Sequence, residues 1–576
     1  MLNFKKNTEM KKLIYIFLIV VTTIFCITSC SDEFLEINPT GSLSSEILAT
    51  EVGIDLALIS SYSMLLGRGG YYADASNWLW GSVLGGDANK GTNAGDQPQI
   101  NEIQTYNAQT NNESILEKYS ATFEGIARAN NTLKLVALAE DAAEDVKNRV
   151  TAEARFLRGH YYFDLKKNFN DVPYVDENWD GVEKVGNDLN LWEPITADFQ
   201  YAYDNLPGTM TDAGRANKWA ARTYLGKALL FQGKYADAKV VFDDVMQNGT
   251  TAKGEPYGLL DNYADCFRST IDNSKESVFA SQAAAGTGTV NNANPGMVLN
   301  FPQGGPSTCC GFFQPSNELV NSFRTNDSGL PLIDGSYNND DYKIKNDLGI
   351  ESTDEFIPDS GNIDPRLDHS VGRRGIPYLD WGIFPGKSWV RDQPYGGPYA
   401  PKKFIYYKAG TGTENDGSSW TPGYTAVNYN IIRYADVLLM AAECEIELGN
   451  LDAGRALINQ VRERAKNSPV TNDDGNMAAN YHIELYESFA DATEARNAVM
   501  MERKLELSGE GHRFYDLVRW DIAAETLNAY LAYEDMLLRS PFSGASFTAN
   551  KNEYLPIPQN EIDLLGADVL KQNPGY

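Results

Sequence analysis

The sequence predicts a mainly α-helical fold, in which four tetratricopeptide-type hairpins form a superhelix that carries a large loop-rich region. Apolar residues recur at helical spacing in four separate blocks, and small residues alternate with large ones inside them. A long stretch rich in Gly, Pro, Asn and Asp separates the second block from the third. The hairpins are expected near residues 113–169, 194–246, 431–465 and 483–520, and the loop-rich subdomain at 247–430.

The first three blocks share one plan. In the first, Phe123, Ile126 and Leu133 recur at helical spacing, and Phe156 and Leu165 continue the pattern. The second contains WAARTYLGKALLFQGKYADAKVVF, and the third contains RYADVLLMAAECEIELGNLDAGRALINQVRERA. Small residues between large apolar ones let two helices approach closely, and stacked hairpins of this kind form a curved superhelix with a concave face.

The fourth block includes ERKLELSGEGHRFYDLVRW, which concentrates titratable residues in the manner of an active site. Glu506, Glu510, His512 and Asp516 all lie within this stretch. A glycosidase needs two carboxylates on opposite sides of a sugar, about 5–10 Å apart, and a tight helical corner rarely offers that gap. We therefore interpret the block as scaffold.

Charge pairing inside this block is expected between neighbours one helical turn apart. Arg503 can pair with Glu506 or Glu502, and Arg513 can pair with Asp516. Such pairs would close the corner between two helices.

The overall charge restricts the partners of the chain. Its 576 residues contain 78 Asp and Glu against 49 Lys and Arg, a formal net charge of −29. This charge repels phosphate backbones, so a nucleic-acid partner and a polyanionic ligand are both disfavoured. A neutral ligand remains open.

The N-terminus predicts a lipoprotein signal peptide at residues 1–29. Lys11 and Lys12 precede an apolar run at 13–25 that is short for a transmembrane helix, and ITSC follows it. ITSC has the form of a bacterial lipobox, which would make Cys30 the lipidated first residue of a mature chain at 30–576. Ordinary cleavage, acylation of Cys26, and a start at Met1 or Met10 all stay open.

Metal and disulfide signals are weak. The remaining cysteines have no metal-ligand spacing, and adjacent Cys309 and Cys310 could close only a strained ring, so we expect no disulfide framework. The segments 338–341 and 472–476 carry oxygen ligands, but neither follows the calcium-loop spacing. No cofactor is predicted, and a structural calcium has no motif support.

Aromatic loops are the candidate ligand sites. In residues 71–91, Trp78 and Trp80 are two positions apart, which in an extended segment directs both indoles to one face. Two indoles form an apolar platform for pyranose rings, and polar neighbours could bind the sugar hydroxyls. These neighbours are Arg68, Asp74, Asn77 and Asp87. The alternative is that both tryptophans belong to the core.

A second candidate group lies in the Gly- and Pro-rich sequence of the loop-rich subdomain. It consists of Trp381, Trp389, Arg391 and Tyr395, and Trp420 is a similar but weaker candidate. Tryptophans beside glycine either form binding platforms or hold their own loops in place, and both interpretations are open.

Five segments, taken together, resemble the SusD/RagB family of outer-membrane nutrient-binding lipoproteins from Bacteroidetes. They are AEARFLRGHYYFDLKKNFNDVPYV, NKWAARTYLGKALLFQGKYADA, IIRYADVLLMAAECE, ERKLELSGEGHRFYDLVRW, and the ending YLPIPQNEID with QNPGY. They occur in family order from residue 152 to the last residue. SDEFLE after Cys30 also resembles the surface-export signal of such lipoproteins.

The resemblance implies a non-catalytic role at the cell exterior. A protein of this family captures a glycan or a peptide and closes as a lid over a SusC-like TonB-dependent transporter in the outer membrane. The tryptophan pairs favour an oligosaccharide over a peptide, and a surface glycosidase is the third alternative. Neither the sugar nor the partner transporter is named by the sequence.

Overall fold

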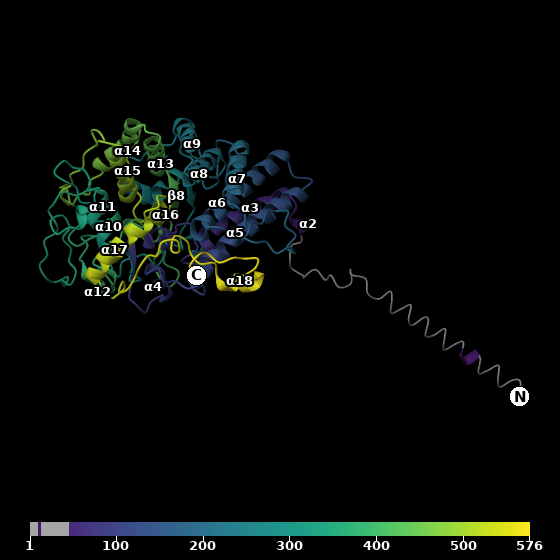
Figure 1. The fold of residues 1–576 in the computed structure, drawn as a ribbon, viewed down its shortest axis with the longest axis horizontal. Coiled ribbons are helices and arrows are strands. Elements are labelled where there is room, and N and C mark those ends of the chain that lie inside the picture. The colour runs from purple at the N-terminus through teal and green to yellow at the C-terminus, as the bar shows by residue number, and fades with distance from the viewer. Residues whose placement is uncertain (1–9, 13–44, 539) are drawn as a thin grey trace.

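The computed structural model describes residues 10–12, 45–538 and 540–576 and has the predicted mainly helical fold (Figure 1). Cys30 and most of the predicted signal peptide lie outside the described residues. Within these ranges, no helix is both long enough and apolar enough to cross a membrane.

The N-terminal half is built on two long helices. They are α5 (Glu113–Leu138) and α6 (Glu144–Phe169), which pack side by side and are covered by α3 (Glu51–Ser63). The side chain of Asn112 caps α5 by accepting hydrogen bonds from the first turn. Gly125 lets α5 approach α6 closely, because a Cβ at this position would lie 2.7 Å from the Tyr161 ring.

The helical array continues through two further groups. Residues 194–246, expected to form one hairpin, contribute to three helices instead: α7 (Trp192–Asn205), α8 (Lys218–Phe231) and α9 (Tyr235–Asn248). After α9 the chain forms the loop-rich subdomain, and the helical array continues with α13 (Tyr434–Glu447), which packs against α9. The later helices are α14 (Leu451–Lys466), α15 (Ala492–Glu506), α16 (Arg513–Arg519) and α17 (Ala523–Leu538).

The loop-rich subdomain is held by short elements. The strands form two-stranded antiparallel sheets, and β1 of the early loop pairs with a strand of the subdomain: β1 (Ala88–Gly91) with β3 (Phe312–Pro315), β2 (Ser277–Ser281) with β8 (Tyr429–Arg433), β4 (Val371–Gly372) with β5 (Ala400–Pro401), and β6 (Asn415–Asp416) with β7 (Tyr424–Thr425). The short helices are α2 (Ser45–Leu48), α4 (Gln99–Gln104), α10 (Asn317–Ser322), α11 (Arg366–Ser370), α12 (Gln393–Gly396) and α18 (Gln559–Leu565). The single-turn elements include η2 (Met64–Gly69) and the π-helix η3 (Trp78–Val83).

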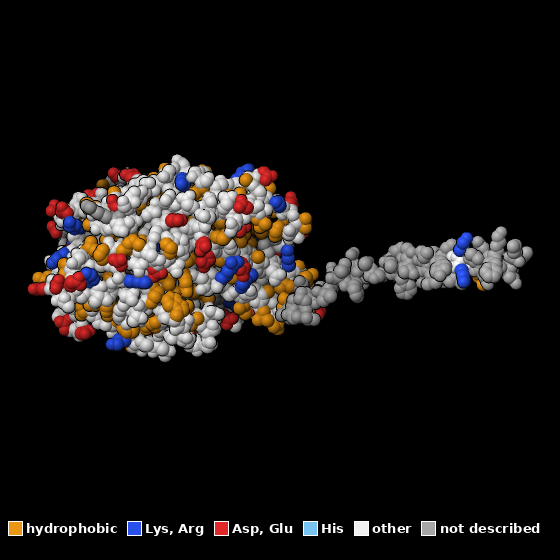
Figure 2. Space-filling model, turned by 90° about the horizontal axis from the view of Figure 1, so that it is seen from below, with side chains coloured by type: hydrophobic (Ala, Val, Ile, Leu, Met, Phe, Trp, Pro, Cys, Tyr) orange, Lys and Arg blue, Asp and Glu red, His pale blue; other side chains and the backbone are white. Residues whose placement is uncertain are grey.

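One large apolar core joins the helices to the early loop, and two smaller clusters order the loop-rich subdomain. One small cluster surrounds Phe323 and Leu367 and includes Met501 and Leu505 of α15. The other surrounds Tyr378 and Phe384 and lies wholly within the subdomain. On the face shown in Figure 2, acidic side chains are scattered among basic ones and do not form one patch.

Candidate functional site

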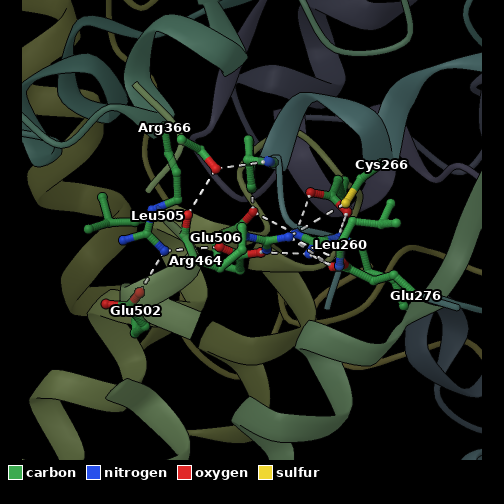
Figure 3. Close-up of polar contacts among 12 residues, drawn as sticks. Leu260, Cys266, Glu276, Arg366, Arg464, Glu502, Leu505 and Glu506 are labelled. Carbon is green, nitrogen blue, oxygen red and sulfur yellow. Dashed lines mark hydrogen bonds and ion pairs between the residues drawn. The ribbon is translucent and has the colours of Figure 1, made fainter. Parts of the chain in front are cut away.

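The carboxylates of the fourth block are buried and paired, and His512 is half-buried beside them. Glu506 is 0% exposed and accepts from Arg433 at 2.6 Å, from Arg366 at 3.0 Å and from Arg464 (Figure 3). Glu510 accepts from Lys403 at 2.7 Å. A substrate cannot reach these carboxylates, because they are enclosed by the junction of the helices with the loop-rich subdomain.

The pairing expected within this block is wrong. Arg503 binds Asp516 at 2.8 Å and Asp436 at 2.7 Å, whereas Glu502 pairs with Arg366 at 2.6 Å. The reason is that this end of α15 is buried on all sides, so its charges meet partners from distant segments. Neighbours one turn apart pair on exposed helix faces.

The electrostatics also argue against proton transfer here. Burial alone would raise the pKa of Glu506, but the charges of Arg464, Arg433 and Arg366 outweigh it and hold the pKa well below its usual range. Burial lowers the pKa of His512 to about 3, so the imidazole is neutral at physiological pH. Glu506 therefore stays ionised and His512 stays neutral, so neither group changes its protonation state near physiological pH.

The predicted platform at Trp78 and Trp80 is wrong in its geometry. The segment is not extended but forms the π-helix η3, and the two side chains are 1% and 0% exposed. The indole N–H groups donate to the carbonyl oxygens of Tyr71 and Tyr72 at 2.8 and 2.6 Å, and Trp78 packs edge-on against Phe313 at 5.7 Å. Both indoles hold the early loop on the core.

The polar neighbours of these tryptophans have internal partners as well. Asn77 donates to Asp164 at 3.0 Å, Asp74 accepts from the Ser76 backbone at 2.9 Å, and Asp87 accepts from the Gly509 backbone at 3.0 Å. These three candidates are buried, so the structure does not present them to a ligand. Burial raises the pKa values of Asp74 and Asp87 to about 6.

Arg68 is the exposed member of this group. It pairs with the Glu124 carboxylate on α5. It therefore lies at the surface, next to the first long helix.

The two tryptophans of the second candidate group are partly buried. Trp389 packs edge-on against Tyr378 and Phe384 at 5.7 and 5.6 Å, and Trp381 donates to the Tyr406 carbonyl oxygen at 3.0 Å. Both side chains hold the loop around its small core, although each keeps a partly exposed edge.

The other two members of this group lie beside the early loop. Tyr395 is 7% exposed and donates to Asn101 at 2.7 Å. Arg391 remains partly exposed and pairs with Asp96 at 2.6 Å, while also donating to Thr92 at 2.9 Å.

The exposed aromatic surface lies at Trp420, which the sequence ranked below the other tryptophans. This side chain is 52% exposed, and its indole N–H donates to the Tyr424 hydroxyl at 3.1 Å. The rings of Tyr71 and Tyr424 meet it edge-on, with centroids 6.4 and 6.3 Å away. Trp420 is the exposed member of this group, Tyr71 is half-buried, and Tyr424 is 8% exposed and supports the indole from below the surface. We call Tyr71, Trp420 and Tyr424 the aromatic surface. Its local sequence, SSWTPG, predicts a loop tryptophan but says nothing of the two tyrosines.

Polar groups border the aromatic surface near Tyr71. Tyr72, the next residue, is 5% exposed, and its hydroxyl has no hydrogen-bond partner within the described part of the chain. Burial raises the pKa of this hydroxyl, and the carboxylates of Glu117 and Asp96 raise it further. Asp96 pairs in turn with Arg391 at 2.6 Å, so charged groups continue from the neighbourhood of Tyr72 to Arg391. Carboxylate and guanidinium groups beside exposed aromatic rings can bind sugar hydroxyls.

The cysteines differ from expectation at one position. Cys309 and Cys310 form a disulfide between adjacent residues, because their Cα atoms, 3.0 Å apart, bring the two sulfur atoms within bonding reach. Cys266 and Cys444 are free and buried. In the ranges that the structure describes, no three His, Cys, Asp or Glu side chains are grouped to hold a metal ion.

A second open site is a polar cleft of about 660 Å³ in the loop-rich subdomain. Arg324 and Asp359 in its wall pair with each other at 2.9 Å, and Tyr342 is a 40% exposed aromatic residue there. A single tyrosine offers less stacking area than the aromatic surface does.

A helical scaffold that exposes a tryptophan supported by two tyrosines, with its carboxylate cluster buried, is compatible with a glycan-binding protein. Comparison with protein families agrees with this class. The model of the SusD family matches residues 275–576, and a model described as "Starch-binding associating with outer membrane" matches residues 35–230. The chain belongs to the SusD family.

Relatives cover nearly the whole chain. SusD-like protein P2 of Formosa agariphila is 25% identical over 98% of this chain and 100% of its own length. A SusD-like protein of Bacteroides ovatus is 26% identical over 87% of this chain and 82% of its own length.

Solved structures agree with the fold. A SusD superfamily protein from Bacteroides vulgatus has a TM-score of 0.67 at 22% identity and covers 91% of this chain and 99% of its own. A structure described as a laminarin-binding SusD-like protein has a TM-score of 0.64 at 25% identity, covering 92% of this chain and 100% of its own.

Proposed function

We propose that this protein is a cell-surface lipoprotein that captures an oligosaccharide without cleaving it and delivers it to a SusC-like TonB-dependent transporter in the outer membrane. The observation that carries the binding step is the exposure of Trp420 with Tyr71 and Tyr424 around it. The indole face can stack against the C–H groups of a pyranose ring, and hydroxyls at the ring edge can reach the polar border.

An open surface suits capture followed by release. The Trp420 indole lies on the exterior rather than in a closed cavity, so a sugar bound to it keeps much of its own hydration and can exchange quickly. Fast exchange is what a protein needs if it must pass its ligand to a transporter as a lid closes. Cys30 would hold the protein in the outer membrane, facing the exterior.

The binding experiment compares two exposed tryptophans. Laminarihexaose, maltohexaose and cellohexaose are suitable neutral probes, the first because a structural relative is described as laminarin-binding. Trp420→Ala is expected to lower the affinity for the bound probe by about tenfold or more, because the stacking face is lost. Trp179→Ala is the matched control, since Trp179 is 39% exposed and belongs to another loop. Equal affinities for the two variants would place the ligand elsewhere.

The anchoring step has a separate test. Cys30→Ser is expected to move the protein from the membrane fraction to the soluble fraction of the cells. Retention of this variant in the membrane would overturn the proposed lipid anchor while leaving the binding site unaffected.

A further inference from the structure

We propose that the disulfide between Cys309 and Cys310 is itself a ligand-contacting part of the glycan site, lying beside Trp420 and extending the apolar surface toward Arg391. The inference deepens the proposed function and rests on it. It concerns a pair of residues to which the general helical scaffold assigns no role.

The position of the disulfide is fixed by contacts on both sides. On one side, the Ser307 hydroxyl lies 3.4 Å from that of Thr421, the residue that follows Trp420. The same Ser307 oxygen accepts from the Cys309 backbone at 3.1 Å. The turn that carries the disulfide therefore lies directly beside the loop that carries Trp420.

On the other side, the disulfide meets the polar border. Arg391 Nη1 lies 3.4 Å from the carbonyl oxygen of Cys310 and 2.6 Å from Asp96. Gly311, the next residue, has a φ of +79°, in the left-handed region that favours glycine. Its carbonyl oxygen accepts a hydrogen bond from the Thr92 backbone N–H at 2.5 Å, which ties the disulfide turn to the early loop. The disulfide thus bridges the aromatic surface and the ion pair of Arg391 with Asp96.

A purely structural role explains this disulfide poorly. A disulfide stabilises a fold mainly by closing a loop in the unfolded chain, and its effect grows with the length of that loop. Cys309 and Cys310 are adjacent, so their bond crosslinks no separate segments. What the bond does provide is a compact apolar surface with polarizable sulfur, and Cys309 remains partly exposed.

The first experiment tests contact directly. The protein is labelled with ¹⁵N-cysteine and titrated with laminarihexaose, maltohexaose and cellohexaose. The amide signals of Cys309 and Cys310 are expected to shift with the binding curve. Those of the buried Cys266 and Cys444 are expected to stay in place and serve as internal controls.

The second experiment tests the contribution to affinity. The double variant C309A/C310A is expected to bind the same probe about three- to tenfold more weakly, as the loss of a sulfur contact implies. Its melting temperature is expected to stay close to that of the wild type. Weaker binding together with a shift of the Cys309 signal in the wild-type titration supports the inference.

The outcomes separate this inference from the function on which it rests. One combination of results overturns the role of the disulfide alone. In it, Trp420→Ala abolishes binding, but the Cys309 and Cys310 signals do not shift and C309A/C310A binds with unchanged affinity. Failure of the wild-type protein to bind any of the three probes overturns the inference together with the proposed neutral-glucan function.

Discussion

The carboxylate of Glu506 lies 2.6 Å from the guanidinium group of Arg433, and neither side chain is more than 1% exposed. Glu506 comes from α15, whereas Arg433 ends β8, which pairs with β2 of the loop-rich subdomain, so this ion pair helps to join the helical array to that subdomain. Two further arginines, Arg366 and Arg464, complete the shell around the carboxylate. Because all these groups are out of water, each depends on the others for compensation of its charge.

Glu506→Gln is expected to destabilise the protein by about 3–5 kcal/mol, since it leaves buried arginines without their shared counter-charge. Chemical denaturation measures this change. Glu484→Gln is the matched control, because the pair of Glu484 with Lys466 is exposed and water screens it, so its loss is expected to change stability little. A Glu506→Gln variant as stable as the control would contradict the assignment of this cluster to the scaffold.

Trp78→Ala is expected to lower the free energy of unfolding by about 3–5 kcal/mol, because it empties a fully buried indole site. The glycan affinity of the folded fraction is expected to stay unchanged. Thermal unfolding and a binding titration on the same sample measure both effects. A stable variant with weakened binding would restore the platform that the sequence predicted.

Buried Glu534 makes the free energy of unfolding depend on pH. It is 0% exposed and accepts from the Glu318 backbone at 3.0 Å and from Asn317 at 3.1 Å. Burial raises the pKa of Glu534 to about 7 from 4.5. Between pH 4.5 and about 7, Glu534 loses its proton in the unfolded chain but keeps it in the folded protein. The contribution of Glu534 to the free energy of unfolding therefore falls as the pH rises.

Glu534→Gln cannot ionise, so it is expected to be more stable than the wild type above pH 7, by about 1–3 kcal/mol. The advantage should shrink toward pH 5. Urea denaturation at pH 5 and pH 8 measures the difference. Glu525→Gln on the same helix removes an exposed carboxylate and controls for net charge. If the stability advantage of Glu534→Gln over the wild type does not grow with pH, the raised pKa of Glu534 is contradicted.

The helices could be predicted because their signals are local. The spacing of Phe123, Ile126 and Leu133 specifies a helical face whatever lies opposite it. The burial of Trp78 could not be predicted in this way. It depends on Phe313, which arrives from a distant segment, and on the π-helix that begins after Asn77 in the left-handed conformation.

The same limit applies to the candidate site. A tryptophan in SSWTPG is readily placed in a loop, but its exposure depends on how that loop meets Tyr71. Likewise, the sequence shows Cys309 beside Cys310 but not that their turn lies against Thr421. Long-range contacts, rather than composition, decided which aromatic residues reach the surface.

Tyr71→Ala tests whether the aromatic surface acts as a unit. Tyr71 supports the Trp420 ring edge-on at 6.4 Å, so its loss frees the indole and removes stacking area. The affinity for a neutral oligosaccharide is expected to fall by about 1 kcal/mol, or roughly fivefold. Isothermal titration calorimetry measures the change. Tyr342→Ala is the control, because Tyr342 is 40% exposed in the polar cleft. If Tyr342→Ala weakens binding and Tyr71→Ala does not, the ligand occupies the polar cleft rather than the surface around Trp420.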